Sequence, residues 1–183
     1  MTIFFISANE YKIDEVKNIL SSESIEVIGH SLKINEIQSE SMEAIVRDKA
    51  EKAYAKLRRP LIVEQTGLHI SDFENLPGGL TQVFWDALQA DKFCKYFSDK
   101  GSVSAETVVA YCDGKKIHIF SGEIDGIIVN APRGNRAFQW DCVFQPTGYD
   151  QTFAEMGEKK NAISMRRIAL EKLRTFLEEK HNV

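Results

Sequence analysis

The chain changes its hydrophobic period within its first 20 residues, and this change restricts the folds that it can adopt. Residues 2–7 are β-branched and aromatic, which predicts a buried strand. The next segment, KIDEVKNIL, predicts a helix whose apolar face consists of Ile13, Val16, Ile19 and Leu20. A strand joined by a short turn to an amphipathic helix is the unit from which α/β folds are built.

The same alternation continues through the next fifty residues. SMEAIVRDKAEKAYAKL predicts a second helix, with Ser41 as its N-cap and Glu43 in its first turn. LIVEQTGL then predicts a buried strand that runs into a turn at Gly67. Glu64 and Gln65 are therefore expected at the strand end, where side chains are delivered to a cleft.

The second half of the chain has a different pattern. NLPGGL predicts a loop, and VFWDALQADKFCKYF predicts an amphipathic helix. ETVVAYC and KIHIFSGEI flank Asp113 and Gly114, a composition typical of a tight hairpin. NAISMRRIALEKLRTFLEEK predicts a last helix with a buried stripe of Met165, Ile168, Ala169, Leu173, Phe176 and Leu177. An antiparallel hairpin within an α/β alternation predicts a mixed sheet.

Length and composition limit the classes of protein. With 183 residues, 43% of them hydrophobic, and no repeat or long linker, we expect a single domain over residues 1–183. The net charge of -4 gives no general attraction to nucleic acid or membranes, and the first apolar run is too short for a signal or membrane segment. Cys94, Cys112 and Cys142 favour reduced thiols in a cytoplasmic protein, with a reactive thiol as the alternative.

The segment FISANEYK has the features of a phosphate site. Ser7, Asn9 and Lys12 meet at a predicted helix N-terminus, where free backbone N–H groups and an ammonium favour an anion. The alternative is that Ser7 or Asn9 only caps the helix and that Lys12 only points to solvent. The segment by itself leaves both interpretations open.

Several short motifs occur together in one order. They are FISANEYK, LKINEIQ, RDKAEKA, VEQTGL, APRG, FQWD, QTFAEM and KKNAISMRR. From Phe4 to about Leu177, this order and spacing resemble the inosine triphosphate pyrophosphatase family. The resemblance implies Mg²⁺-dependent hydrolysis of ITP, dITP or XTP to the monophosphate and pyrophosphate. It also implies a homodimer, and an elongated α/β fold in which a mixed twisted sheet flanked by helices forms two lobes around a central nucleotide cleft.

The resemblance implies one group of residues for the triphosphate and its metal. Ser7, Asn9 and Lys12 would hold the triphosphate, with Lys49 as a second cation. Glu36 would supply an oxygen ligand to Mg²⁺. Taken alone, Lys49 could be an exposed helix charge and Glu36 an ordinary surface acid.

The resemblance implies a second group of residues for the purine base. Phe138 would stack on the purine, while Trp140 and Asp141 would shape its pocket. From the start of the last helix, Lys160 would approach the phosphates and Arg166 would donate hydrogen bonds to the purine 6-oxo group. The alternative for Phe138 and Trp140 is a place in the core.

Gln65 departs from the family pattern, which has an Asp here that ligates the metal or activates the attacking water. The resemblance implies that Lys12 and Gln65 are catalytic residues and that Glu36 and Gln65 are the metal ligands. An amide accepts no proton at neutral pH and supplies no charge to Mg²⁺, although it can orient a water. Glu64 points to the opposite strand face, so rescue would need a shifted backbone or another acid such as Asp72.

Three further positions differ from the family pattern. Met165 stands where a His is common, and Gln139 and Cys142 stand where Gly and Pro are favoured. Three hypotheses therefore follow: an active pyrophosphatase with a reduced rate or altered substrate, a nucleotide-binding homologue that does not hydrolyse, and a structural or interaction subunit.

Overall fold

The fold is built on one mixed sheet. The computed structural model describes residues 1–181, and their strands lie in the order β2-β1-β3-β5-β6-β7, with β4 paired to β3. The strands are β1 (Thr2–Ile6), β2 (Glu26–His30), β3 (Leu61–Ile70), β4 (Pro77–Gly78), β5 (Val103–Cys112), β6 (Ile117–Ile128) and β7 (Phe144–Pro146). β1 pairs in parallel with β2 and β3, and the remaining pairs are antiparallel. The predicted mixed sheet and the β5–β6 hairpin are confirmed.

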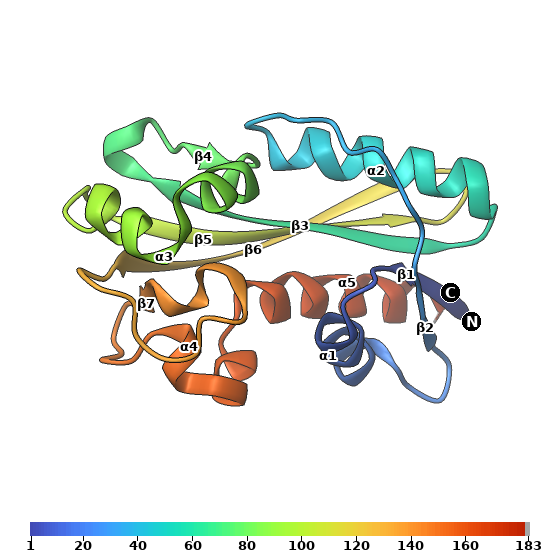
Figure 1. Cartoon of the computed structure of the whole chain (residues 1–183). Helices are drawn as coiled ribbons and strands as arrows, with labels where there is room; N and C mark the ends of the chain where they lie inside the picture. The colour runs from blue at the N-terminus through green and yellow to red at the C-terminus, as the bar shows by residue number, and fades with distance from the viewer. Residues whose placement is uncertain (182–183) are drawn as a thin grey trace.

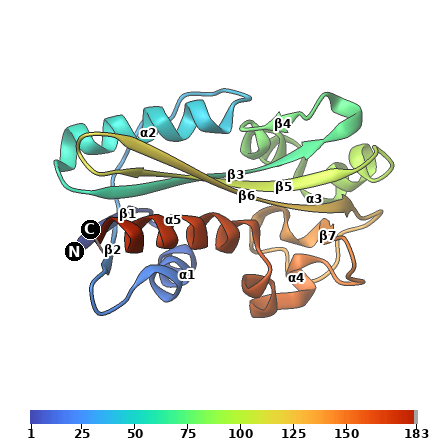
Figure 2. The ribbon, with the colours of Figure 1, turned by 180° about the vertical axis from the view of Figure 1, so that it is seen from behind.

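Helices cover both faces of this sheet. They are α1 (Glu10–Leu20), α2 (Met42–Leu57), α3 (Thr81–Phe97), α4 (Phe153–Met156) and α5 (Met165–His181), with short 3₁₀ turns at Ser71–Phe73, Gln139–Cys142 and Gly157–Ala162. α2 lies along one face, and α1 and α5 lie on the other (Figure 1). The view from behind shows the same layers (Figure 2). None of the helices in residues 1–181 has the length and apolar character needed to span a bilayer.

Side chains at the helix starts fix where the helices begin. The Ser41 side chain accepts a hydrogen bond from Ala44 N at 3.2 Å, which confirms the predicted N-cap of α2. Asn9 caps α1 in the same way by accepting from Lys12 N at 3.2 Å. Three residues thus separate the end of β1 from the start of α1, and the connecting turn is held tightly at the carboxyl end of that strand.

The apolar core consists of three clusters. The first surrounds α3, α4 and β7 and includes Leu68 and Ile70 from β3. The second packs β1 and the middle strands against α1 and α5, and the third packs the sheet against α2. Residues 64–67 of β3 belong to none of the three. The centre of β3 is therefore a polar break between apolar clusters.

The predicted turn at Gly67 is wrong. β3 continues to Ile70 and pairs with β5 along its whole length, from Leu61 opposite Cys112 to Ile70 opposite Val103. A Cβ at Gly67 would collide with the carbonyl oxygen of Gly78 and lie 2.8 Å from Met42 Sδ. The glycine therefore permits close packing of β4, which lies within the segment predicted to be a loop.

The close contact between β6 and α5 also depends on a glycine. A Cβ at Gly122 would collide with the carbonyl oxygen of Met165 and lie 2.7 Å from Ala169 N. These backbone atoms belong to the first turns of α5, so Gly122 sets how closely the helix can lie on the sheet.

We predict that Gly122→Ala lowers the free energy of unfolding by about 1–3 kcal/mol, because the added methyl group overpacks against helix backbone that cannot rotate away. Urea denaturation measures this change. Ser121→Ala, at the exposed neighbouring position, is the control and should change stability by no more than about 0.5 kcal/mol. Equal stability of the two variants would contradict the prediction.

Candidate functional site

Four residues predicted to hold phosphate or metal surround one cavity. Ser7, Lys12, Glu36 and Lys49 line it together with Glu64, and its volume is about 330 Å³. They come from the turn after β1, from α1, from the segment before α2, from α2 and from β3. We call this the phosphate-end cavity. Sequence segments that are far apart therefore contribute to one lining.

The turn after β1 is rigid because its small polar side chains bond to its own backbone. Ser7 Oγ accepts from Asn9 N at 3.1 Å, and Asn9 Oδ1 accepts from Lys12 N at 3.2 Å. Ser7 and Ala8 line the phosphate-end cavity, but Asn9 is not among its lining residues. In this structure both side chains form the turn, and their predicted contact with phosphate stays a prediction.

Lys12 and Lys49 converge on Glu64 from opposite sides of the sheet. Lys12 Nζ lies 3.0 Å from Glu64 Oε1. Lys49 Nζ lies 2.8 Å from Glu36 Oε1 and donates to the carbonyl oxygen of Glu64 at 3.2 Å. Lys49 is buried, so the interpretation of it as an exposed helix charge is wrong. Both ammonium groups are held at the cavity by acidic partners.

A buried ion-pair network lies beneath this cavity. Arg166, in the first turn of α5, donates from Nε to Glu64 Oε2 and from Nη1 to Glu15 Oε2, each at 2.8 Å. Ser164 Oγ donates to the other oxygen of Glu15 at 3.2 Å. Glu15 was missed by sequence reasoning. Its position in the helical repeat could have identified it, because it lies three residues after Lys12 and four before the buried Ile19 on one helix face.

The charges of Glu64 and Arg166 are fixed over a wide pH range. Burial alone would raise the pKa of Glu64, but Arg166 and Lys12 outweigh burial and lower it to about 2. Burial alone would lower the pKa of Arg166, and Glu64 and Glu15 raise it instead. Glu64 Oε1 is buried and accepts no directed hydrogen bond, so its contact with Lys12 is an ion pair only.

The residues predicted for the base line a second pocket. Phe138, Trp140, Asp141 and Arg166 meet there, together with Lys160, which was predicted to approach the phosphates, and beside Thr66 and Met165. We call this the base-end pocket. Its free volume is only about 10 Å³, so the pocket is nearly closed in this structure. Because Arg166 lines this pocket and Glu64 lines the other cavity, their ion pair joins the two.

Lys160 does not lie where the resemblance implied. It belongs to the 3₁₀ turn before α5, not to the helix, and it lines the base-end pocket rather than the phosphate-end cavity. Its Nζ lies 4.2 Å from the centre of the Phe138 ring and forms an ion pair with Asp141. Burial raises the pKa of Asp141, and the charge of Lys160 opposes that rise. Lys160 therefore covers the ring that is predicted to stack on a purine.

Trp140 is a core residue as well as a pocket residue. Its ring centre lies 5.9 Å from that of Phe144 and 6.4 Å from that of Phe153. Both phenylalanines are fully buried in the first apolar cluster. The base-end pocket is thus braced directly against the core.

Gln65 lies on the opposite face of β3 from Glu64, as strand alternation predicted. Its Nε2 donates to the carbonyl oxygen of Gly79 at 3.3 Å, and the side chain lines neither the phosphate-end cavity nor the base-end pocket. Asp72, the acid considered as a replacement, lies in a 3₁₀ turn beside Gly101 and also lines neither. Gln65 holds the β4 segment in this structure.

The phosphate-end cavity has donors that suit a hard cation bound together with phosphates. Glu36 has a half-exposed carboxylate beside Lys49, and Glu64 Oε1 lacks a directed partner. Within residues 1–181, no group of three or more His, Cys, Asp or Glu could hold a metal alone. Mg²⁺ is usually bound through one or two carboxylates plus substrate phosphates, and these residues fit that mode.

The chain is similar to known proteins in sequence and in fold. The family model described as "Ham1 family" matches residues 3–176. An inosine triphosphate pyrophosphatase of Yarrowia lipolytica is 40% identical, over 98% of this chain and 97% of its own. A dITP/XTP pyrophosphatase of Ignicoccus hospitalis is 34% identical, over 96% of each chain. The structure of a HAM1 protein from Coxiella burnetii has a TM-score of 0.84 and 26% identity, and the match covers 98% of this chain and 99% of that one.

We predict that Glu64→Gln lowers the free energy of unfolding by about 3–5 kcal/mol at neutral pH, because Arg166 and Lys12 lose a buried counter-charge. The pKa of Glu64 is lowered from 4.5 to about 2 on folding, so its ionisation stabilises the fold above pH 4.5 and this contribution is lost as the pH falls towards 2. The stability difference between the native protein and the variant should shrink over that range in denaturation curves.

Glu43→Gln is the matched control for this acid. Glu43 forms an exposed pair with Arg47 one turn along α2, so its loss should cost about 0.5 kcal/mol or less. A Glu64→Gln variant as stable as this control at pH 7 would show that the buried network contributes nothing.

Proposed function

The chain belongs to the Ham1 family, and we propose that it hydrolyses non-standard purine nucleoside triphosphates, namely ITP, dITP and XTP, to the monophosphate and pyrophosphate with Mg²⁺. The names of the relatives from Yarrowia lipolytica and Ignicoccus hospitalis support this substrate class. The observation that carries the proposal is the ion pair between Glu64 and Arg166. It connects a cavity lined by Lys12 and Lys49 to an aromatic pocket, which matches the two ends of a nucleotide.

The phosphate-end cavity supplies the charges that a triphosphate needs. When phosphate oxygens enter, Lys12 and Lys49 can exchange their contacts with Glu64 and Glu36 for contacts with the ligand. Attack of water on the α-phosphorus releases pyrophosphate, whose developing negative charge these two ammonium groups would stabilise. Both ammonium groups already line the cavity before the ligand arrives, so only a change of side-chain partner is needed on binding.

Mg²⁺ fits at Glu36, whose carboxylate lines the cavity next to Lys49. The ion would spread the charge of the phosphates. Within residues 1–181, Glu36 forms an ion pair with Lys49 only, so its oxygens become available when Lys49 moves towards the phosphates.

The base-end pocket can distinguish an oxo from an amino purine. Arg166 uses Nε and Nη1 for its two acidic partners, and within residues 1–181 its Nη2 donates no hydrogen bond. A donor fixed in this way matches a 6-oxo group and would face another donor in adenine. Lys160 would have to leave the Phe138 ring before a purine could stack on it.

The alternative is that the protein binds nucleotides without hydrolysing them, and Gln65 favours it. The amide is bonded to Gly79 and cannot accept a proton. Glu64 does not replace the missing base, because a carboxyl with a pKa of about 2 holds a proton too weakly to take one from water efficiently. Hydrolysis would therefore depend on Gln65 turning to orient a water, and we propose that it is slow.

Two further properties remain proposals. The three cysteines are buried and free, which suits a protein that works in the reducing cytoplasm. A homodimer rests on the family resemblance alone, and a mass measurement in solution tests it.

We predict that Lys49→Ala lowers kcat/KM for ITP by about 10- to 100-fold, because a charged contact with phosphate is lost. A pyrophosphate-release assay with ITP, XTP, GTP and ATP, with and without Mg²⁺, measures this effect. Lys92→Ala removes an exposed lysine from α3 and should leave the rate unchanged. Equal rates for the two variants would place the phosphates elsewhere.

We predict that Gln65→Asp raises kcat at least about tenfold, because a carboxylate can accept a proton and supplies charge to Mg²⁺. Gln65→Asn is the matched control, since it has the same length as Asp but stays neutral and should give no rise. If Asp is no faster than Asn, the amide does not limit the reaction.

The same proteins separate hydrolysis from binding. If no variant releases pyrophosphate but ITP with Mg²⁺ raises the melting temperature, the protein binds without turnover. If there is neither turnover nor a rise, both functions are overturned.

A further inference from the structure

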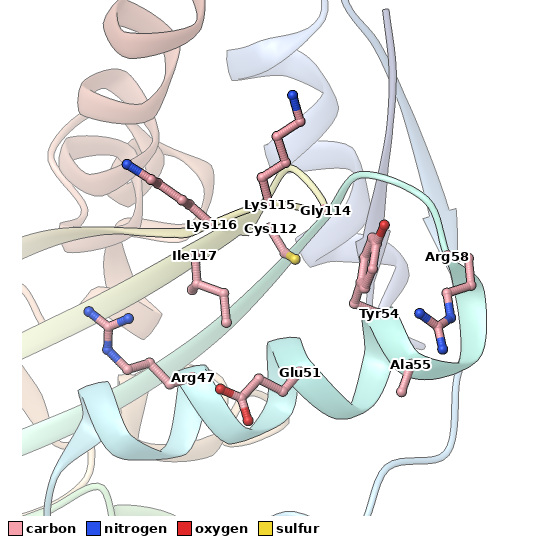
Figure 3. Close-up of a pocket in the computed structure, with 10 residues that line it drawn as sticks. All are labelled: Arg47, Glu51, Tyr54, Ala55, Arg58, Cys112, Gly114, Lys115, Lys116 and Ile117. Carbon is pink, nitrogen blue, oxygen red and sulfur yellow. The ribbon is translucent and has the colours of Figure 1, made fainter.

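The cations that line a cavity of about 460 Å³ between α2 and the β5–β6 turn do not converge on one point (Figure 3). Arg47 is already paired with Glu43 at 2.7 Å. Lys115 and Lys116 extend away from α2, so neither faces Arg47 across the cavity. The contacts that the proposed function leaves unexplained lie elsewhere, between α3 and the base-end pocket.

The segment 134–139, which we call the strap, carries Phe138 to the base-end pocket. Residues 134–138 belong to no helix or strand, and residues 134–137 are exposed. Gly134 fixes the start of the strap, because a Cβ there would lie 2.8 Å from backbone atoms of Ala154 and Glu155 in α4. The strap ends in the 3₁₀ turn that contains Trp140.

Two side chains of the strap bond to α3, one on each side of Phe138. Arg136 donates from Nη1 to Asp91 Oδ2 at 2.8 Å and from Nη2 to Asp91 Oδ1 at 3.3 Å. Gln139 Nε2 donates to Gln82 Oε1 at 2.6 Å. The residue predicted to stack on the purine is therefore held between two contacts to one helix.

A kink in α3 separates the two points of attachment. Gln89 has φ of 55°, which interrupts the helix, and its Nε2 donates to the carbonyl oxygen of Trp85 at 3.1 Å. A non-glycine residue keeps such a backbone conformation only where its surroundings determine it. Gln82 lies before the kink and Asp91 after it, so each part of the helix holds one end of the strap.

Gln139 makes a contact that the residue favoured by the family pattern could not make. Its φ is 41°, in the left-handed region that glycine adopts without strain, and glycine is favoured here in the family. A glycine has no side chain with which to bond Gln82. The hydrogen bond to α3 thus offsets part of the strain at Gln139 and belongs to this chain's own sequence.

The strap and Lys160 differ in how firmly they are held. In the described part of the chain, the Lys160 side chain has two contacts, the Phe138 ring and Asp141, and both lie within the base-end pocket. The strap is attached outside the pocket, to α3 and α4. When a purine enters, Lys160 is the part that can leave, and the strap is the part that stays.

We propose that Gln82 and Asp91 are positioning residues for the purine base, and this role rests on the proposed function. Acting through Gln139 and Arg136, they keep the Phe138 ring in place when Lys160 leaves it. Neither Gln82 nor Asp91 lines the phosphate-end cavity or the base-end pocket, so both act on the base only through the strap. A ring that is already in place loses less freedom on binding, which strengthens the binding of the base.

Kinetics of ITP hydrolysis at low ionic strength test this role, because exposed charges interact most strongly there. Arg136→Asp places an acid opposite Asp91 and should raise KM about three- to tenfold while kcat changes less than twofold, since the base is remote from the reacting phosphorus. The charge-reversed double variant, Arg136→Asp with Asp91→Arg, should restore KM. Lys92→Ala, at an exposed neighbouring position of α3, should leave both constants unchanged.

The second attachment has its own pair of variants. Gln82→Ala removes the oxygen that accepts from Gln139 and should also raise KM. Gln82→Glu retains an accepting oxygen and should give a smaller rise. Equal KM values for these two variants would contradict the role of Gln82.

NMR of the full chain without nucleotide measures the position of Phe138 directly. The Lys160 ammonium lies over the Phe138 ring, so the ring current should shift the ε-methylene protons of Lys160 upfield. Arg136→Asp should move these resonances towards those of an exposed lysine, and the charge-reversed double variant should return them.

The two measurements distinguish this proposal from the proposed function. The positioning role is overturned if the Lys160 resonances do not respond to Arg136→Asp, or if KM is unchanged in that variant while the native protein hydrolyses ITP. It is also overturned if charge reversal restores neither. If the resonances respond but the native protein neither hydrolyses nor binds ITP, the hold of α3 on Phe138 is supported and the proposed function is overturned.

Discussion

The ion pair between Glu64 and Arg166 is the interaction on which the rest of the site depends. It joins the centre of β3 to the first turn of α5, at the place where the three apolar clusters leave a polar break. A buried charge pair is tolerated when further partners compensate for its loss of water. Glu15 pairs with Arg166 and Lys12 pairs with Glu64, and these two contacts draw α1 into the same network. Removal of any one charge would therefore disturb three elements together.

Much of the fold could be predicted because its signals are local. The switch from strand to helix period at the N-terminus, the N-cap at Ser41 and the hairpin around Asp113 and Gly114 each depend on neighbouring residues. Gly67 misled the prediction, because a glycine that permits close packing of another strand has the same sequence signature as one in a turn. That distinction depends on Gly78, whose position the local sequence does not specify.

The candidate site also has residues that could be predicted from the sequence and residues that could not. The family resemblance led to Lys12, Lys49 and Glu36, and the structure places these three around one cavity. Glu15 could not be found in this way, because its partner Arg166 lies 151 residues away and only the packing of α1 on α5 brings them together. The position of Lys160 was missed for a related reason, since the 3₁₀ turn before α5 shifts it towards Phe138.

The two neighbouring positions in β3 show how stability and catalysis compete for the same strand. Alternation sends Glu64 into the buried network and Gln65 towards Gly79, so each side chain has one fixed environment. The surroundings that make Glu64 an effective anchor also lower its pKa to about 2, which makes it a poor proton acceptor. Gln65 does not anchor the ion-pair network, but its amide can only orient a water and cannot accept a proton from it. A chain with this pair can thus keep the fold of its family, and under the proposed function its rate of hydrolysis would depend on the residue at position 65.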